Sequence, residues 1–346
     1  MKKKYILGIE TSCDETSVAV IDEDLKILSN VVSSQIDIHK EFGGVIPEIA
    51  ARNHVKIIDK VFERAIRDAG IRTSQLKMVA ATTHPGLPGA VMVGRVFAES
   101  VAVALDIPFV PVNHIHGHIA SVPLSLSQTR DFDFLMLCTE KYLSLVVSGG
   151  HTALYLVNHK AKQPIKLLER TTDDAVGEAF DKIAKVLGLA YPGGPEIARE
   201  AEKYIGDLTA VDLIKGEPFV TFVHRPNYAR PNFSYSGLKT AVLNYVNKQR
   251  QLGLEINVPH IAASFQNEAV AQLVVKSILK LRETKTNILT VSGGVSANEF
   301  LRVALENECE GIGADVLFPA HNLTTDNAAM IAAAATLFEA PPIRSK

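Results

Sequence analysis

The chain has 346 residues, of which 47% are hydrophobic, and a formal net charge of −2. This length exceeds the size at which one hydrophobic core stops growing, so we expect two lobes, each with a sizeable interior. The charge excludes a globally basic protein that holds nucleic acid unaided, because Lys and Arg contacts to phosphate supply most of such affinity. A nucleic-acid substrate would need a small local footprint or a partner protein.

The sequence gives little indication of a targeting segment or of a membrane span. The basic run Lys2–Lys4 resembles the start of a signal peptide, but the apolar stretch after it stops at Glu10 and no cleavage site follows. No apolar run approaches the roughly 20 residues that span a bilayer. Three widely spaced cysteines, Cys13, Cys138 and Cys309, favour reduced thiols over a disulfide framework or a cysteine-based zinc site. We therefore expect a cytoplasmic protein without a membrane span.

Strands and helices are predicted to alternate along the first part of the chain. β-Branched residues predict an antiparallel meander, and apolar residues at helical spacing predict the helices that follow it. In order, these are strands over 5–9, 17–21 and 26–32, a helix over 47–69, a strand over 77–82 and a helix over 90–105. The polar stretch near 125–133 is the expected lobe boundary.

The second part repeats this order of strands and then helices. The predicted elements are strands around 142–157, a helix over 174–187, a long helix over 265–283, a strand over 287–292 and an Ala-rich helix over 326–339. This repetition predicts an internally duplicated α/β fold.

Three turns rich in Gly, Ser and Thr adjoin apolar strands, within 8–20, 146–154 and 291–298. Glycine lets the backbone approach a phosphate closely, and hydroxyls and free amides supply hydrogen-bond donors. None of the turns has the Gly-Lys-Ser/Thr of a Walker loop or the G-x-G-x-x-G fingerprint. A plain hairpin turn is the alternative for each one alone. The recurrence of strand, polar turn and strand in both halves favours two phosphate sites and a nucleoside site around one cleft.

Two histidines carry a metal signal. His114 and His118 lie four residues apart, on one face of a helical turn, where two imidazoles can bind one ion, and His116 points elsewhere. A chance pair packed against a helix is the alternative on spacing alone. Ile115 stands where a zincin would have its water-activating glutamate. Asp326 is a candidate third ligand, although an aspartate that opens a helix often only stabilises the helix dipole.

Asp181 lies at the edge of the apolar stripe of the helix predicted over 174–187, so it could face a cleft or simply solvent. The segment Tyr191–Pro195 that follows is rich in glycine and proline. Such a backbone suits a close approach to a ligand.

A series of motifs then occurs in order along nearly the whole chain. They are Ile9–Thr16, Pro47–His54, His84–Gly94, His114–His118, Ser148–Thr152, Gly177–Gly194, Phe233–Thr240, Ser292–Asn298 and Thr325–Ala328. Together they resemble the bacterial TsaD family of tRNA threonylcarbamoyltransferases, once labelled O-sialoglycoprotein endopeptidases. The resemblance implies a two-lobed, duplicated fold of the actin, sugar-kinase and heat-shock-chaperone class, with the active site in the cleft between the lobes. The expected lobes are 1–128 with 325–346, and 129–324.

The resemblance also implies a reaction and its residues. The expected reaction transfers the L-threonylcarbamoyl group from threonylcarbamoyl-AMP to the exocyclic N6 of adenosine 37, just 3′ of the anticodon, in tRNAs that read codons beginning with A, and releases AMP. One divalent metal ion per subunit, expected to be iron with zinc and manganese as alternatives, would be held by His114, His118 and Asp326. Asp14 and Glu15 are expected to act in the transfer. The expected substrate contacts are Val146, Val147, Ser148, Gly149, Gly150, Asp181, Gly194 and Asn298.

The resemblance further implies two protein partners, an inactive fold relative similar to TsaB and a small ATPase similar to TsaE, which the mild charge accommodates. The sequence departs from the family pattern in two places. Many relatives have Glu where this chain has His116, and the segment 134–143 is longer than the family pattern before Ser148.

Three other function classes make different demands on the sequence. A small-molecule kinase of the same fold should have a catalytic aspartate and a sugar-binding surface, for which the sequence has no match. A metallopeptidase would need a glutamate next to a zinc-binding histidine. A non-catalytic assembly subunit would not need the ligand set His114, His118 and Asp326.

Overall fold

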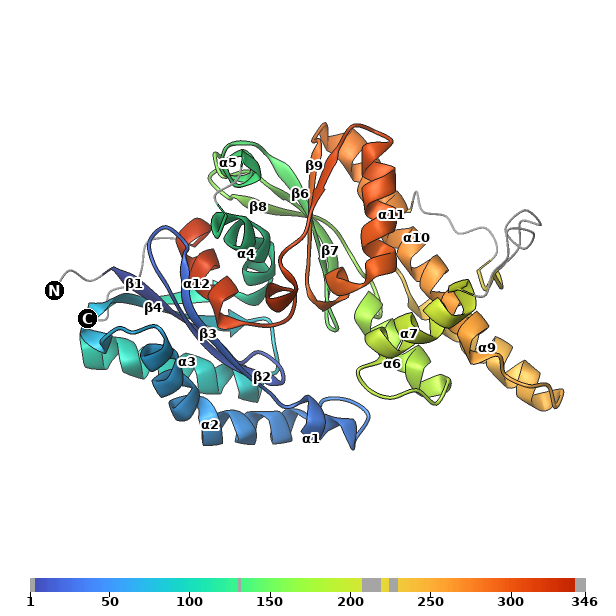
Figure 1. Ribbon diagram of the computed structural model, residues 1–346, viewed down its shortest axis with the longest axis horizontal. Helices are drawn as coiled ribbons and strands as arrows, with labels where there is room; N and C mark the ends of the chain where they lie inside the picture. Colours follow the sequence, from blue (N-terminus) through green and yellow to red (C-terminus); the bar gives the residue numbers. More distant parts are fainter. Residues whose placement is uncertain (1–3, 130–131, 207–218, 224–229, 340–346) are drawn as a thin grey trace.

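The computed structural model of the chain describes residues 4–129, 132–206, 219–223 and 230–339. Two five-stranded mixed sheets organise it (Figure 1). The first sheet contains β1 (Tyr5–Glu10), β2 (Glu15–Ile21), β3 (Ile27–Ser34), β4 (Leu76–His84) and β5 (Phe109–Asn113). The second contains β6 (Tyr142–Val147), β7 (Thr152–Val157), β8 (Ile165–Arg170), β9 (Ile288–Ser292) and β10 (Asp315–Leu317).

The two sheets share one topology. The strand orders are β3-β2-β1-β4-β5 and β8-β7-β6-β9-β10. In each sheet the first three strands form an antiparallel meander, the fourth pairs parallel with the first, and the fifth pairs parallel with the fourth. The prediction of a duplicated α/β fold is confirmed.

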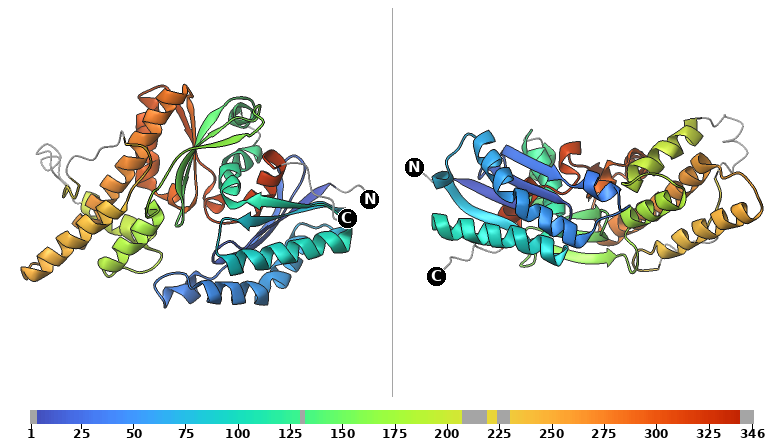
Figure 2. Two further views of the ribbon diagram at one scale, coloured as in Figure 1. Left: turned by 180° about the vertical axis from the view of Figure 1, so that it is seen from behind. Right: turned by 90° about the horizontal axis from the view of Figure 1, so that it is seen from below.

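The helices divide between the two sheets. Those near the first sheet are α1 (Ile36–Lys40), α2 (Pro47–Asp68), α3 (Pro88–Leu105), α4 (His114–Ser127) and α12 (Ala328–Leu337). The others are α5 (Phe132–Thr139), α6 (Val176–Val186), α7 (Gly193–Gly206), α9 (Ser236–Gln251), α10 (Val258–Thr284) and α11 (Glu299–Glu310). As Figure 2 shows, α9 and α10 extend away from the first sheet.

Most predicted elements match the structure to within a few residues, including the opening meander, α2, α3, α6, β9 and α12. The helix predicted over 265–283 begins earlier, at Val258. Several elements were not predicted: β5, β8, β10, α1, α5, α7, α9, α11 and the extension of α4 to Ser127. Within the polar stretch 125–133, α4 ends and α5 begins, while residues 130 and 131 lie outside the described residues. The longer segment 134–143 forms most of α5 and the start of β6. Residues 340–346, the end of the expected first lobe, also lie outside the described part.

The first sheet is covered on both faces, as its alternating side chains require. Figure 1 shows α2 and α3 on one face, and α4 and α12 on the other. Leu7 and Ile9 pack in the core with α2 and α3, whereas Ile6 packs in the core with α4 and α12. The second sheet packs against α6, α7, α9, α10 and α11 in a separate large core.

Helix α3 is the one described helix long and apolar enough to cross a membrane by length and composition, with a mean hydropathy of 1.4. It packs against β4 and α2. Arg95 and Glu99 on its outer side form an ion pair of 2.8 Å. These contacts are those of a helix that covers a sheet.

Helix α4 joins the two halves of the molecule. Ala120 and Leu124 pack in the core shared with α12 and the first sheet. Ile115 and Ile119 pack instead with Tyr142 and other residues of the second sheet. Because α4 is buried on several sides, it lacks the one-sided apolar pattern that would predict its full length.

Gly8 allows α12 to lie directly on β1. A Cβ atom at this position would lie 2.1 Å from the Ala328 carbonyl oxygen and 3.0 Å from the Ala332 Cβ. The first of these contacts is with backbone, which cannot rotate away. The close approach also fixes the segment before α12, which contains Asp326.

We expect Gly8→Ala to lower the free energy of unfolding by about 1–3 kcal/mol, because the added methyl group overpacks the contact between β1 and α12. The midpoint of urea or thermal denaturation measures this. Gly237→Ala is the matched control, since a Cβ at Gly237 meets no heavy atom within 4 Å. Equal stability of both variants and the wild type would contradict the close packing described here.

Candidate metal centre and transfer site

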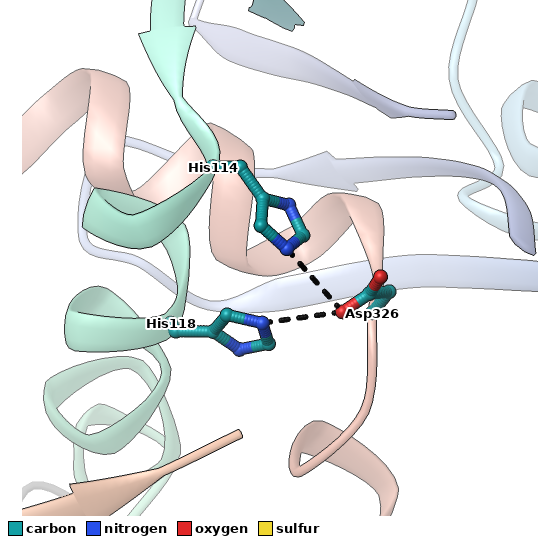
Figure 3. Close-up of side chains that lie close together, drawn as sticks. All are labelled: His114, His118 and Asp326. Carbon is teal, nitrogen blue, oxygen red and sulfur yellow. Dashed lines mark ion pairs between the residues drawn. The ribbon is translucent and has the colours of Figure 1, made fainter. Parts of the chain in front are cut away.

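His114, His118 and Asp326 meet at one point (Figure 3). His114 opens α4 and His118 lies one turn later, so both imidazoles project from the same face. Asn113 caps this helix, and its Oδ1 accepts from the Ile115 N–H at 2.8 Å. Asp326 comes from the segment just before α12. Its Oδ1 lies 3.5 Å from His114 Nε2 and 3.2 Å from His118 Nε2.

These three residues suit a metal ion. One potential ligand atom from each lies within 4.8 Å of the others. His118 is fully buried, and apart from the 3.2 Å approach of its Nε2 to Asp326 its ring nitrogens make no polar contact among the described residues. Buried polar groups normally have hydrogen-bond partners. A buried imidazole whose polar contacts are this few, beside a carboxylate, is therefore suited to bind a metal cation. The structure brings together the ligand set that the sequence implied.

Glu10 contacts the side of the His114 ring that faces away from Asp326. Its carboxylate is fully buried at the end of β1, and its Oε2 lies 3.0 Å from His114 Nδ1. Thr82 Oγ1 and the Ser12 N–H also donate to this carboxylate. These contacts place a proton on His114 Nδ1, while Nε2 faces Asp326 and would be the nitrogen that binds a metal; this is the arrangement that orients a ligating histidine. No sequence pattern singled out Glu10.

The charges of the cluster depend on each other. Burial lowers the pKa of His114, but the carboxylates of Asp326 and Glu10 outweigh it and raise this pKa to about 9. Burial raises the pKa of Asp326, but His114 and His118 outweigh it and hold the pKa well below its ordinary range. The same balance between burial and His114 keeps the pKa of Glu10 low. Two carboxylates with their negative charge held in a buried site make a strong attraction for a cation.

We expect Glu10→Gln to weaken metal binding by about 10- to 100-fold, as is typical when the outer partner of a ligating histidine is removed. Competition with a chromophoric chelator, using the metal-free protein and Zn²⁺ or Mn²⁺, measures the affinity.

Glu339→Gln is the control for this prediction. The Glu339 carboxylate lies 2.9 Å from Nδ1 of His116, a histidine of the same helix that is outside the ligand set. This variant should bind the metal as the wild type does. Equal affinities for the Glu10 and Glu339 variants would rule out an orienting role for Glu10.

Asp14 lies in the turn of the hairpin that connects β1 to β2, and Glu15 is the first residue of β2. Asp14 is buried, and Glu15 accepts from Ser34 Oγ at 3.1 Å. Burial, Asp14 and Asp326 together raise the pKa of Glu15 well above its ordinary range. The hairpin and the metal cluster therefore share one electrostatic environment. A carboxyl group with a raised pKa is suited to carry a proton near neutral pH.

The second glycine-rich turn follows β6. Val146 and Val147 are fully buried in the sheet, so only their backbone can meet a ligand. Ser148 N–H donates to His151 O at 2.8 Å and closes the turn. A Cβ at Gly149 or Gly150 would meet nothing within 4 Å, which leaves open space beside this backbone.

The third turn packs against the second. Gly293 has φ +91°, and a Cβ there would lie 2.3 Å from Val147 O. At Gly177, near the start of α6, a Cβ would lie 2.6 Å from Ser148 O. Both glycines permit close backbone contact around the end of β6. Asn298 caps α11, accepting from the Leu301 N–H at 3.0 Å, and its amide donates to Gln266 Oε1 at 2.8 Å.

Asp181 on α6 faces the start of α7, where its Oδ1 accepts from the Gly193 N–H at 2.7 Å. Burial raises the pKa of Asp181, the Gly193 hydrogen bond opposes this, and Asp14 adds to it. Burial, Asp14 and Asp181 raise the pKa of Tyr191. Asp14 therefore acts electrostatically on both groups from the opposite half of the chain. A Cβ at Gly194 would meet nothing within 4 Å.

His151 links the second turn to the metal cluster, a role that the sequence motif around it did not specify. Its ring centroid lies 6.4 Å from that of His114. Burial and the neighbouring His114 and His118 lower its pKa to about 4. His116, in contrast, turns toward Glu339 and away from the cluster, as its spacing predicted.

A sequence model of the TsaD family, described as tRNA N6-adenosine threonylcarbamoyltransferase, matches residues 26–333. The chain belongs to the TsaD family. A relative from Syntrophomonas wolfei with the same description is 44% identical over 96% of this chain and 92% of its own length. One from Clostridium perfringens is 43% identical over 97% and 93%.

Solved structures agree on the fold. The HypF protein of T. kodakarensis matches with a TM-score of 0.55 at 12% identity, over 96% of this chain and 47% of its own. The activator of 2-hydroxyisocaproyl-CoA dehydratase from Clostridium difficile, solved with bound ADPNP, matches with a TM-score of 0.51 at 12% identity, over 96% and 94%. At these identities the likeness concerns the fold alone, which is of the actin and sugar-kinase class.

Family membership establishes the class of activity. The chain is a transferase that modifies tRNA by threonylcarbamoylation, rather than a kinase or a peptidase. The His and Asp cluster of this TsaD protein is a possible metal site.

Proposed function

We propose that this TsaD protein transfers the L-threonylcarbamoyl group from threonylcarbamoyl-AMP to N6 of adenosine 37 in tRNAs that read codons beginning with A, and releases AMP. The observation that carries the proposal is the meeting of His114, His118 and Asp326 beside the hairpin of Asp14 and Glu15. His151 connects this cluster to the glycine-rich turn after β6. These contacts support a site in which metal ligands, a proton carrier and an open glycine backbone act on one substrate.

The chemistry explains why these groups are needed. An adenine amine is a poor nucleophile because its lone pair is delocalised into the ring, so the carbamoyl carbon must be activated, here as a mixed anhydride with AMP. We propose one divalent ion per subunit, held by His114, His118 and Asp326. Two imidazoles and a carboxylate suit iron, zinc or manganese, and iron is our first candidate. When bound, such an ion supplies Lewis acidity toward a carbonyl or phosphate oxygen.

The glycine-rich turns would hold the AMP portion. Backbone amides of the segment from Val146 and Val147 through Ser148, Gly149 and Gly150 can donate to phosphate oxygens without a positive side chain. Gly194, near the start of α7, offers a similar approach at a helix N-terminus. We place Asp181 and Asn298 on the nucleoside side of the same ligand. Asp181 and Asn298 also hold the starts of α7 and α11, so they would shape the site as well as contact the ligand.

Asp14 and Glu15 would accept the proton that the attacking amine loses. As the N6 atom attacks the carbamoyl carbon, a C–N bond forms, the C–O bond to the phosphate breaks, and AMP leaves with the bonding electron pair. The attacking amine must lose one proton. The neighbouring carboxyl groups of Asp14 and Glu15 would accept it and pass it to solvent.

The proposal extends to the lobes, partners and location of the protein. We propose lobes of 1–128 with 325–346 and of 129–324, with the active site in the cleft between them. The net charge of −2 supports shared binding of tRNA with partners, an inactive fold relative similar to TsaB and a small ATPase similar to TsaE. We propose that the enzyme acts in the cytoplasm, where tRNA is modified.

The decisive experiment incubates the purified, metal-loaded protein and its two partners with threonylcarbamoyl-AMP and unmodified tRNA. Mass spectrometry of the digested tRNA then measures the modified nucleoside. A matched tRNA with inosine at position 37 lacks the N6 amine and should gain nothing. Modification of the inosine tRNA, or no modification of either while an AMP analogue still binds, would overturn the proposal.

A further inference from the structure

We propose that His54 is a positioning residue for the transfer step, because its imidazole braces the hairpin that carries Asp14 and Glu15. The inference rests on the role proposed above for these two carboxyl groups. His54 lies on α2, outside the metal cluster and the glycine-rich turns. Its side chain is fully buried.

Three successive carbonyl groups of the hairpin each accept a hydrogen bond from a different segment. Leu87 N–H donates to Ser12 O at 2.8 Å, just before α3. Gln35 N–H donates to Asp14 O at 3.0 Å, just before α1. Between them, Cys13 O lies 2.9 Å from His54 Nε2. His54 is the one side chain among these three donors, and it holds the peptide group that leads directly into Asp14.

The other ring nitrogen of His54 contacts Thr16, the residue that directly follows Asp14 and Glu15. His54 Nδ1 lies 2.7 Å from Thr16 Oγ1. Because the Cys13 carbonyl can only accept, Nε2 must carry the proton, and Nδ1 then accepts from the Thr16 hydroxyl. One rigid ring therefore connects residue 13 to residue 16 and encloses Asp14 and Glu15 between its two contacts.

The surroundings of His54 favour the neutral ring that this tautomer requires. Burial lowers its pKa, the Cys13 carbonyl, Glu10 and Asp14 oppose this, and His39 adds to the lowering. Gln35 Nε2 lies 3.4 Å from Nδ1 and supplies a second donor to that nitrogen. The Gln35 side chain is itself held by Asn53, whose amide donates to Gln35 Oε1 at 3.2 Å.

Loss of the two His54 contacts should slow the transfer step more than it destabilises the fold. The hairpin would remain attached through Ser12 O and Asp14 O, but the Cys13 peptide could rotate and displace the Asp14 carboxyl group. A displacement of about 1 Å at a reacting group costs about a hundredfold in rate. The metal ligands stand on α4 and before α12, so metal binding should not change.

The test compares three variants that remove different parts of the imidazole. His54→Leu removes both contacts. His54→Gln can place an amide N–H near the position of Nε2, whereas the shorter His54→Asn cannot reach Cys13 O. We expect about a hundredfold slower transfer for the Leu and Asn variants, at unchanged metal content and unchanged affinity for AMP, and recovery of at least a tenth of the wild-type rate with Gln.

A second measurement does not depend on transfer. Cys13 is partly buried, and burial, Asp14 and Asp326 hold the pKa of its thiol well above the ordinary range, so it should react slowly with iodoacetamide. We expect its alkylation to accelerate by about tenfold in His54→Leu, because two buried hydrogen bonds that close the hairpin are lost. Peptide mass spectrometry follows Cys13, with Cys138 on α5 as the internal reference.

Ile58→Ala is the matched control, since Ile58 is buried one turn further along the same face of α2 but makes none of the hairpin contacts. If it accelerates Cys13 alkylation as much as His54→Leu, the effect is one of helix stability and the proposal is wrong. Wild-type transfer and alkylation in a folded His54→Leu protein would also overturn it. If the wild type transfers nothing, the proposed function fails, and the alkylation series still decides whether the brace exists.

Discussion

The His118→Ala protein will lose its bound metal and will transfer the threonylcarbamoyl group at least about a hundredfold more slowly than the wild type, because a Lewis acid supplies several kcal/mol of transition-state stabilisation. Asp326 is the one polar group that the buried His118 ring approaches among the described residues, so its surroundings give it no polar role outside this cluster. Removing it leaves His114 and Asp326, which are too few ligands for a tight site. Elemental analysis gives the metal content, and nucleoside mass spectrometry gives the transfer.

The neighbouring histidine provides the control for this result. His116 lies two residues away on the same helix and pairs with Glu339 instead of the cluster. His116→Ala should therefore keep both its metal and its transfer rate to within a few fold. If His118→Ala retains a full complement of metal, or if both variants lose it equally, the ligand set described here is incorrect.

Asp14→Ala will slow transfer by about 10²- to 10⁴-fold, the usual contribution of a positioned acid or base. Asp14 is buried beside Glu15, whose raised pKa arises from burial and then from the charges of Asp14 and Asp326. Removing Asp14 takes away one carboxyl group of the pair that would accept the amine proton. It leaves the turn after β6 intact, so the affinity for AMP should stay within a few fold. Single-turnover rates and calorimetric titration separate the two effects.

Asp37→Ala is the matched control for Asp14→Ala. Asp37 is an exposed aspartate on α1 that pairs only weakly with Lys40 at the surface, with 94% of its side chain exposed. This variant should transfer as the wild type does. An Asp14→Ala protein with an unchanged single-turnover rate would remove Asp14 from the chemistry.

Much of the fold was predictable where one physical signal dominated. The helix over 47–69 was predicted because its apolar residues recur at helical spacing, and β1 to β3 because β-branched runs alternate with acidic turns. The full length of helix α4 was not predicted, because no single signal dominates in its sequence. It is buried against both sheets and contains Pro123, so neither an apolar stripe nor composition marks its end. Edge strands such as β8 and β10 are short or exposed and carry little pattern.

The residues of the candidate site also fall into two groups, those that sequence patterns indicated and those that they missed. Local spacing made His114 and His118 a candidate pair and left Asp326 as a candidate third ligand. The resemblance joined the three, because nothing local distinguishes a ligand from a helix-opening aspartate. Glu10 and His54 act through contacts with residues distant in sequence, at His114 and Cys13. Such contacts exist only after the strands pair and α2 packs on the sheet. Sequence patterns therefore identified groups that act locally and missed those that orient other groups.

The placement of the three candidate ligands has a consequence for repeated turnover. His114 and His118 on α4 and Asp326 before α12 belong to elements that pack on each other and on the first sheet. The glycine-rich turns and His151 belong to the second sheet. Because α4 packs on α12 as well as on both sheets, a movement of the second sheet would shift the turns while α4 and α12 kept the three side chains together. Under the proposed function, a bound ion would then stay in place from one turnover to the next.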